Sequence, residues 1–410
     1  MTDQPTTQSL LRTAGWPYFL VAFVARLPFA MNVVGVLTLV VSVRESLSLG
    51  GLTAAAVGLG TAVFGPLLGA AADRFGQRIV LVLMAVGNAA MLLVFTLTVY
   101  TDTPVFAVLL AGFAVGATAP QVAPMSRSRL VTIITERMPP ERHDRVISST
   151  MAYESAADEV VFVFGPFVVG LLASTIAPWM PLVLSAALTL LFVLAFALHP
   201  SGSHISAARG ADGRAPSSAA ELAHPALLVV IVGILGMGLF FGSMLTSLTA
   251  FMDERGEPEQ AGLLYGVMGV GSAILALGAA WFPATFSLRA RWVFFAALLF
   301  GGSLLLLVVD DTVGMLVALA LMGIGVGPTL VTQYSFGAAR SPVGRSATVM
   351  TMLGSAVIVG QSLAAAITGE VAEQADASAA LLVPIAAAAI VLLAGVLNWR
   401  PSNPHSRLSR

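Results

Sequence analysis

The chain has 410 residues, of which 57% are hydrophobic and only 10% are charged, and its formal net charge is -1. A composition this apolar excludes a water-soluble protein, because large hydrophobic patches would be exposed to solvent. The absence of cysteine excludes disulfides, thiolate metal sites and cysteine nucleophiles, and the absence of lysine excludes the phosphate-binding loop of an ATP-driven pump.

Twelve apolar runs follow one another along the chain, separated by short polar breaks. A bilayer core of about 30 Å requires about 20 apolar residues in a helix, whose backbone groups bond internally. The first run is too long for a signal peptide and lacks a small-residue cleavage site, so we expect it to be retained. We predict an all-α membrane protein with transmembrane helices at residues 17–41, 50–71, 78–100, 104–126, 147–174, 179–199, 225–250, 260–283, 291–309, 313–334, 346–369 and 378–399.

A short charged turn, Gly69-Ala-Ala-Ala-Asp73-Arg74-Phe75-Gly76-Gln77-Arg78, connects the second and third runs. Gly76 permits a tight turn, and the carboxylate of Asp73 can accept hydrogen bonds from a helix N-terminus or from an arginine. The alternative is a solvated loop that only follows the excess of basic residues on the cytoplasmic side.

This turn resembles the signature G-x-L-a-D-r-x-G-r-k between the second and third helices of the major facilitator superfamily. The matching residues are Gly69, Asp73, Arg74, Gly76 and Arg78. Ala71 replaces the leucine of the signature, and Gln77 replaces its first trailing basic residue. The resemblance implies the major facilitator fold and a gate in which Asp73 and Arg74 hold the outward-open state.

A glycine pattern in the fourth run, Gly112-Phe-Ala-Val115-Gly116-Ala-Thr118, returns 211 residues later in the tenth run as Gly323-Ile-Gly-Val326-Gly327-Pro-Thr329. Glycines four residues apart allow neighbouring helices to pack closely. Because related halves are typical of secondary transporters, we predict two pseudo-symmetric six-helix bundles. The predicted domains are an N-terminal bundle at 1–199, a cytoplasmic linker at 200–224 and a C-terminal bundle at 225–410 with a short cytoplasmic tail.

The fifth run contains Gly165-Pro166-Phe-Val-Val-Gly170, which resembles part of the g-x-x-x-G-P-x-x-G-G motif of drug:proton antiporters within the superfamily. Val161 and Val169 stand where two of the glycines of that motif would be. A proline inside a helix removes a backbone hydrogen bond and bends the helix, which favours a gate. The alternative is a kink that serves packing alone.

The chain also departs from that antiporter pattern. Those antiporters carry an arginine in the fourth helix, where this chain has Gly112, so the resemblance does not imply proton coupling through that position. The segment Tyr153-Glu154-Ser-Ala-Ala-Asp158-Glu159 before the proline motif resembles efflux-type members from actinobacteria, which does not identify a substrate.

Four ionisable residues stand inside predicted spans: Arg26 in the first, and Glu154, Asp158 and Glu159 in the fifth. Arg26 lies about 13 Å beyond the start of its helix at 1.5 Å per residue, so it needs an anionic partner. Glu154 and Asp158 share a helix face by their i, i+4 spacing. We predict that Arg26 pairs with these acids.

Three carboxylates beside one arginine cannot all stay ionised in a low dielectric, so we expect at least one of them to bind a proton near neutral pH. Glu159 is the first choice for the proton carrier and Asp158 the second. We expect Glu154, which lies nearest the cytoplasmic end of the helix, to be partly hydrated. The alternative is a static pair between Arg26 and Asp158 that never titrates.

Polar residues also stand in the helices that line the central cavity of the resembled fold. They are Asn32, Gln121, Gln333, Tyr334 and Gln361. We expect these side chains to contact substrate, and the alternative for each is a hydrogen bond between helices.

The arginines fix the expected orientation. With both termini in the cytoplasm, every arginine except Arg26, Arg44 and Arg255 lies on the cytoplasmic side, as the positive-inside rule requires. We expect a multi-pass protein of the inner (plasma) membrane. The remaining arginines include the group Arg127, Arg129, Arg137, Arg142 and Arg145, which we place in a cytoplasmic segment beside lipid headgroups.

The sequence therefore predicts a monomeric secondary transporter that exports small amphipathic compounds by proton antiport. Its expected partners are a small-molecule substrate, protons and membrane lipid, and we expect no nucleic acid, metal or cofactor. It carries no nucleophile motif and no histidine cluster, so we do not expect an enzyme. The alternatives are import by symport or facilitated diffusion, and a membrane sensor or lipid-handling scaffold that moves no solute.

Overall fold

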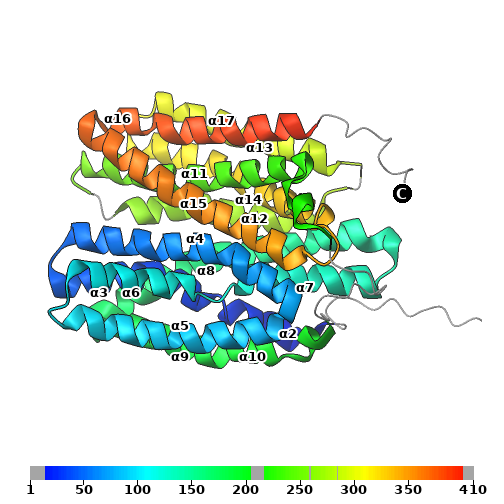
Figure 1. Cartoon of the computed structure of the whole chain (residues 1–410). Helices are drawn as coiled ribbons and strands as arrows, with labels where there is room; N and C mark the ends of the chain where they lie inside the picture. Colours follow the sequence, from blue (N-terminus) through cyan, green and yellow to red (C-terminus); the bar gives the residue numbers. More distant parts are fainter. Residues whose placement is uncertain (1–13, 205–216, 258–259, 284, 400–410) are drawn as a thin grey trace, which may run out of the picture. The chain divides into compact units, whose positions relative to one another are not determined.

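A computed structural model of the chain describes residues 14–204, 217–257, 260–283 and 285–399, and every regular element in these ranges is a helix (Figure 1). Within these described ranges, twelve helical segments are long and apolar enough to cross a membrane. The prediction of an all-α membrane protein with twelve transmembrane helices is confirmed.

The helices begin and end within a few residues of the predicted bounds in most spans. A π-helical turn at Thr189–Val193 joins α9 and α10 into one span. In chain order the helices are α2 (Trp16–Val24), α3 (Leu27–Arg44), α4 (Leu47–Phe75), α5 (Gln77–Tyr100), α6 (Val105–Ala117), α7 (Val122–Arg137), α8 (His143–Thr175), α9 (Met180–Leu188), α10 (Leu194–Leu198), α11 (Pro225–Asp253), α12 (Ala261–Gly278), α13 (Leu288–Leu304), α14 (Thr312–Ala339), α15 (Ser346–Gln374), α16 (Ala377–Ala380) and α17 (Leu382–Asn398).

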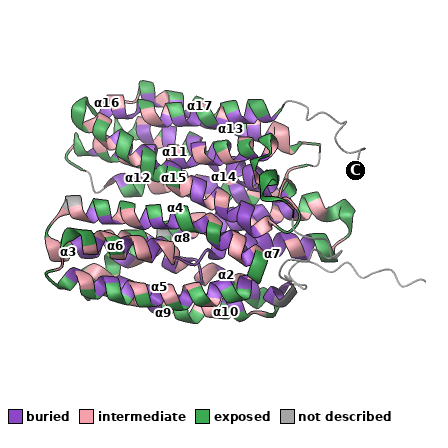
Figure 2. Cartoon of the chain, in the orientation of Figure 1, coloured by how far each residue is buried: buried purple, intermediate pink, exposed green. Residues whose placement is uncertain are grey.

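Both buried and exposed residues occur along most of the helices (Figure 2). The exposed positions include large apolar side chains, among them Phe106, Leu263 and Trp281, which are 74%, 76% and 80% exposed. In water such side chains would be driven into a core. Their exposure is the pattern of a helix surface that faces lipid tails.

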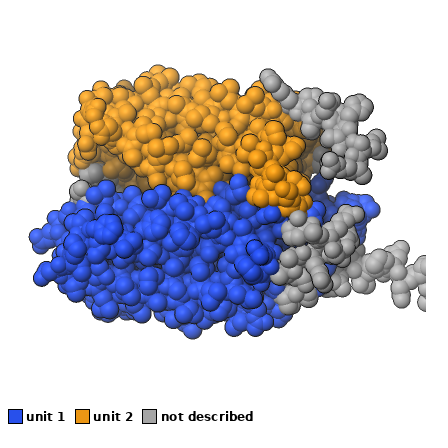
Figure 3. All heavy atoms as spheres, viewed as in Figure 1, with its two compact units in different colours: residues 1–150, 160–216, 343–352 blue, residues 151–159, 217–342, 353–410 orange. Residues whose placement is uncertain are grey.

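The contacts divide the chain into two units (Figure 3). Unit 1 comprises residues 1–150, 160–216 and 343–352, and unit 2 comprises residues 151–159, 217–342 and 353–410. Two helices therefore contribute to both units. Residues 151–159 of α8 pack with unit 2, and the start of α15 packs with unit 1.

Three spans that we predicted as single helices are interrupted, the last of them only at Leu381, between α16 and α17. The first span breaks at Ala25 and Arg26, between α2 and α3, because Pro28 has no N–H to donate to the last turn of α2. The fourth span breaks at residues 118–121, between α6 and α7, at Pro120. Prolines within predicted spans thus place Arg26 and Gln121 at helix ends rather than in continuous helices.

The repeated glycine pattern makes the same contact in both units. A Cβ atom on Gly116 of α6 would lie 1.9 Å from the carbonyl oxygen of Val57 in α4. A Cβ atom on Gly327 of α14 would lie 2.0 Å from the carbonyl oxygen of Ser272 in α12. Only glycine fits this backbone contact, so the predicted close packing of helices is confirmed at both places.

Replacing Gly116 by alanine is expected to destabilise the chain by about 1–3 kcal/mol, because α4 and α6 must separate to admit the methyl group. Thermal unfolding of the detergent-purified protein measures this loss. Gly87→Ala in α5 is the matched control, because the nearest atom to its Cβ, in Thr118, would be 3.8 Å away. Equal unfolding temperatures for the two variants would contradict the contact.

Arginines at helix ends repeat at the same spacing of 211 residues. Nε of Arg44, at the end of α3, donates to the carbonyl oxygen of Val99 near the end of α5 (2.8 Å). Nη2 of Arg255, just after α11, donates to the carbonyl oxygen of Asp310 after α13 (2.6 Å). Arg44 thus links the first span of the chain to the end of the third, and Arg255 links the seventh span to the end of the ninth.

A second arginine pair at this spacing is Arg129 and Arg340. Arg129 donates to the carbonyl oxygen of Phe196 (3.0 Å) and to Gln77 Oε1 (3.2 Å), and its guanidinium lies 4.1 Å from the centre of the Phe196 ring. Arg340 donates to Asn398 Oδ1 (2.6 Å) and to the carbonyl oxygen of Ala226 (2.5 Å). The fourth and tenth spans are each tied in this way to the last helix of their half.

These contacts correct the predicted location of two arginines. The fourth span continues beyond residue 126 as α7, and Arg127 and Arg129 are 2% and 0% exposed rather than set among lipid headgroups. Buried arginine is tolerated where carbonyl oxygens and an aromatic face replace water, as they do for Arg129.

Candidate functional site

The acidic segment of α8 forms a polar contact with α12 inside unit 2. Ser272 Oγ of α12 donates a hydrogen bond to Glu159 Oε1 at 2.7 Å. Ser272 is fully buried, and Glu159 is half-buried. Sequence reasoning missed Ser272, because a serine in an apolar helix commonly bonds its own backbone.

Two further ionisable groups lie within electrostatic range of Glu159. They are Asp158, its neighbour on α8, and the phenol of Tyr265, seven residues before Ser272 on α12. Glu159 therefore has a hydroxyl group as its hydrogen-bond donor, and a phenol and a second carboxylate act on it electrostatically. This environment allows a carboxyl group to exist either ionised, with the hydroxyl as donor, or protonated.

The other charged residues of the predicted cluster are Glu154 and Asp158 on α8 and Arg26 at the start of α3. Glu154 is 0% exposed, so the expectation that it is partly hydrated is wrong: its position along α8 did not reveal that its side of the helix is packed. Arg26 is 3% exposed and lies at the break between α2 and α3, in unit 1, whereas Glu154, Asp158 and Glu159 belong to unit 2. The pairing of Arg26 with these acids stays a prediction.

The charged turn is held by one carboxylate, which contacts the start of a helix. Asp73, near the end of α4, accepts hydrogen bonds from the backbone N–H of Ala347 (3.0 Å) and of Thr348 (2.7 Å). The hydroxyl of Thr348 donates to the same carboxylate at 2.6 Å. Both partners lie in the first turn of α15, where free N–H groups and the helix dipole favour a negative charge.

Glycines shape this contact. A Cβ atom on Gly69 would lie 2.1 Å from Thr351 Oγ1 and 2.8 Å from the carbonyl oxygen of Ala347, so glycine lets α4 reach the start of α15. Gly76 has a φ of +91°, which ends α4 and begins α5 without strain. Arg74 and Arg78 are exposed, and the guanidinium of Arg74 lies 5.2 Å from the centre of the neighbouring Phe75 ring.

The glycine–proline motif of the fifth span lies within a continuous helix. α8 runs through Pro166 to Thr175 without a break. A Cβ atom on Gly165 would lie 2.8 Å from the Cβ atom of Ala30 in α3, so this glycine provides a close helix contact in unit 1. No atom lies within 4 Å of the Cβ position at Gly170 among the described residues.

Two of the predicted substrate contacts are engaged within unit 1. Asn32 Oδ1 of α3 accepts a hydrogen bond from Ser185 Oγ of α9 at 2.5 Å. Gln121 Nε2 donates to the carbonyl oxygen of Ala119, within the break between α6 and α7 (3.1 Å). Asn32 thus makes the bond between helices that was the alternative to substrate binding, and Gln121 stabilises the broken helix.

The three predicted contacts from unit 2 differ in burial. Gln361 is exposed, and Tyr334 is 6% exposed. Gln333 is 0% exposed, and neither atom of its side-chain amide has a hydrogen-bond partner among the residues that the structure describes. The amide nitrogen would lie 2.9 Å from a Cβ atom on Gly233, a position that the ring of Trp292 also borders. An unpaired buried amide is costly, which makes Gln333 the strongest of the three for contact with a polar ligand or water.

The family model of the Major Facilitator Superfamily matches residues 18–365 of this chain. A comparison with curated protein sequences finds no match.

Solved structures of transporters share the fold. The human organic anion transporter MFSD10 (TETRAN) is 20% identical, with a TM-score of 0.72 over 96% of this chain and 100% of that one. A bacterial homologue of the iron transporter ferroportin, in an outward-facing state, is 14% identical, with a TM-score of 0.74 over 95% and 99% of the two chains. The E. coli fucose:proton symporter is 18% identical, with a TM-score of 0.62 over 95% and 100%.

Proposed function

The chain belongs to the major facilitator superfamily, and from this premise we propose that it exports small amphipathic compounds in exchange for protons, by alternating access. The observation that carries the proposal is the hydrogen bond between Glu159 and Ser272, because it places a titratable group between two membrane-spanning helices. A carboxyl group is rarely kept at such a position without a functional reason.

Proton exchange at Glu159 acts on the contact between α8 and α12. The ionised carboxylate accepts the hydrogen bond from Ser272, and protonation removes the charge that makes this bond strong. A proton therefore weakens the attachment of residues 151–159 to unit 2. Asp158 is the second candidate for the carrier, and Arg26 is the proposed counter-ion of the acidic segment.

Asp73 is proposed to control which conformational state the transporter adopts. Its three hydrogen bonds to the first turn of α15 hold the charged turn in one state, and we assign this as the outward-open state. Arg74 and Arg78 support the turn through their charge, and the proposed role of Pro166 is to make α8 easier to bend, because proline has no backbone N–H. Asn32, Gln121, Gln333, Tyr334 and Gln361 remain the proposed substrate contacts, with Gln333 foremost.

The remaining assignments follow from the arginine distribution and the repeat. We propose a monomer in the plasma membrane with both termini in the cytoplasm, and bundles at 1–199 and 225–410 that move as the two halves of the transport cycle.

Transport in everted membrane vesicles tests the function and its direction. Compounds are first selected by the resistance that the chain confers on a strain lacking its own exporters. In everted vesicles with an acidified interior, a proton antiporter accumulates the selected compound, and adding the compound raises the interior pH reported by a fluorescent dye. Efflux of the compound from the vesicles together with protons would instead indicate a symporter that imports.

A further inference from the structure

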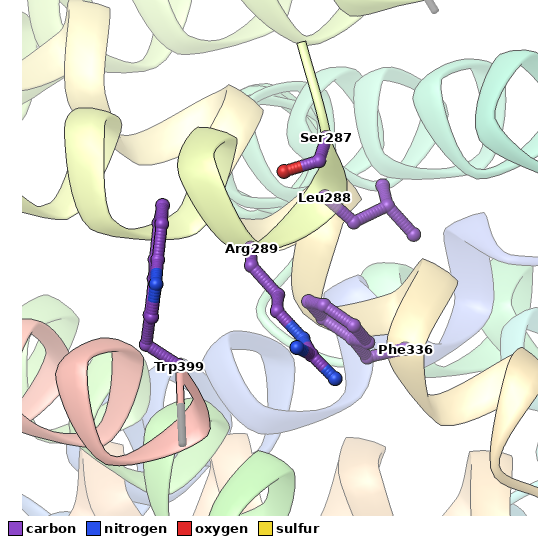
Figure 4. Close-up of a pocket in the computed structure, with 5 residues that line it drawn as sticks. All are labelled: Ser287, Leu288, Arg289, Phe336 and Trp399. Carbon is purple, nitrogen blue, oxygen red and sulfur yellow. The ribbon is translucent and has the colours of Figure 1, made fainter. Parts of the chain in front are cut away.

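A pocket of about 470 Å³ lies in unit 2 where the ends of three helices meet (Figure 4). It is lined by Ser287, Leu288 and Arg289 at the start of α13, by Phe336 near the end of α14, and by Trp399 after α17. The Arg289 side chain extends between the rings of Trp399 and Phe336 (Figure 4). None of the residues proposed above for substrate or proton transfer lines this pocket.

The pocket carries positive charge without a matching negative one. None of its five lining residues is acidic, and Arg289 makes no hydrogen bond or ion pair among the described residues. Arg340, one turn beyond Phe336, uses uncharged oxygens of Ala226 and Asn398 as its acceptors. Burial, and after it the positive charge of Arg289, lower the pKa of Arg340 to about 10. Two neighbouring arginines would be stabilised by an anion.

An apolar cavity adjoins the basic one. A second pocket of about 320 Å³ is lined by Val293, Val396 and Trp399 and has no polar lining. Val293 lies one helical turn beyond Arg289, and Val396 lies three residues before Trp399, so this cavity continues along the same two helices toward their middle. Trp399 lines both cavities and is 50% exposed. Tryptophan is enriched at the boundary between water and membrane.

We propose that the two cavities form a binding site for an anionic phospholipid, with the phosphate of the headgroup at Arg289 and one acyl chain along Val293 and Val396. A free phosphate would satisfy the arginine but would leave the apolar cavity unused. Basic pockets between transmembrane helices bind anionic headgroups in this way. In the proposed orientation the lipid belongs to the cytoplasmic leaflet.

Native mass spectrometry of the delipidated full-length chain in detergent measures the binding. We expect phosphatidylglycerol adducts that phosphatidylcholine does not form at the same concentration. Arg289→Ala is expected to weaken phosphatidylglycerol binding about fivefold, and Arg289→Lys, which keeps the charge, to weaken it less. Arg142→Ala removes the same charge from an exposed arginine of unit 1, and it is expected to weaken phosphatidylglycerol binding less than Arg289→Ala does.

Two results would overturn the site. Equal losses of binding in Arg289→Ala and Arg142→Ala would mean that the lipid follows net charge rather than this pocket. Displacement of phosphatidylglycerol by an equal concentration of glycerol phosphate would mean that the apolar cavity contributes nothing and that the site takes a free anion. Binding of phosphatidylglycerol and of phosphatidylcholine can also be compared on the wild-type chain alone. This comparison tests the proposal even if a variant does not fold.

Discussion

Replacing Glu159 by glutamine is expected to reduce proton-driven transport to the level of vesicles without the protein, while exchange of substrate for substrate continues. Glutamine keeps the size of the side chain and can still accept a hydrogen bond from Ser272, but it cannot exchange a proton. Proton-driven accumulation in everted vesicles and counterflow in proteoliposomes measure the two activities. The difference between them isolates the coupling step from folding and substrate binding.

Two further variants make this prediction specific. Glu141→Gln removes an exposed carboxylate at the start of the same span and is expected to leave both activities unchanged. Proton-driven transport that survives in Glu159→Gln would show that another group carries the proton, and Asp158→Asn would then be the next variant to measure.

Ser272→Ala is expected to keep proton-driven transport but to move its pH profile upward by about one to two units. The hydroxyl stabilises the ionised form of Glu159, and a hydrogen bond to a charged group contributes about 1.5–3 kcal/mol. Alanine leaves the backbone contact of Ser272 with Gly327 in place, so the helices are expected to pack as before. An unchanged pH profile would mean that Ser272 does not influence the proton carrier.

The fold could be predicted from the sequence because each transmembrane helix is specified locally. Length and apolarity located the twelve spans, and the Gly112 and Gly323 patterns indicated the repeat. The predicted bounds and continuity of a helix were wrong where a single residue overrode the pattern of apolar residues. Pro28 interrupts the first span, and Arg129 extends the fourth because distant acceptors at Phe196 and Gln77 replace water.

Only part of the candidate site could be predicted from the sequence. Glu159 stands out because acids are rare in apolar spans, and Asp73 stands out by its spacing from Gly69 and Gly76. Ser272 gave no comparable signal, because its partner is 113 residues away and serine is unremarkable in a membrane helix. The burial of Glu154 depends on helix rotation, which the periodicity of a nearly uniform apolar helix does not determine.

Replacing Asp73 by asparagine is expected to open the contact between the charged turn and the start of α15. The aspartate offers two oxygens to three donors, from Ala347 and Thr348, whereas asparagine offers one oxygen and places an NH₂ group opposite the others. Losing one charge-assisted bond of about 1.5–3 kcal/mol shifts the equilibrium about 10–150-fold toward the open contact. We expect the outward-open state to lose population accordingly.

The absence of cysteine provides a direct measurement of this opening. Ala347→Cys introduces a single thiol at a position that is 1% exposed, so its rate of labelling by a maleimide reports how often the contact opens. Adding Asp73→Asn is expected to raise that rate at least about tenfold, whereas labelling of Thr135→Cys, on an exposed position of α7, is expected to stay the same. Gly69→Val tests the contact by bulk instead of charge, because its Cβ would lie 2.1 Å from Thr351 Oγ1. If Gly69→Val raises the rate and Asp73→Asn does not, helix packing rather than the carboxylate holds the turn, and the gating role of Asp73 is wrong.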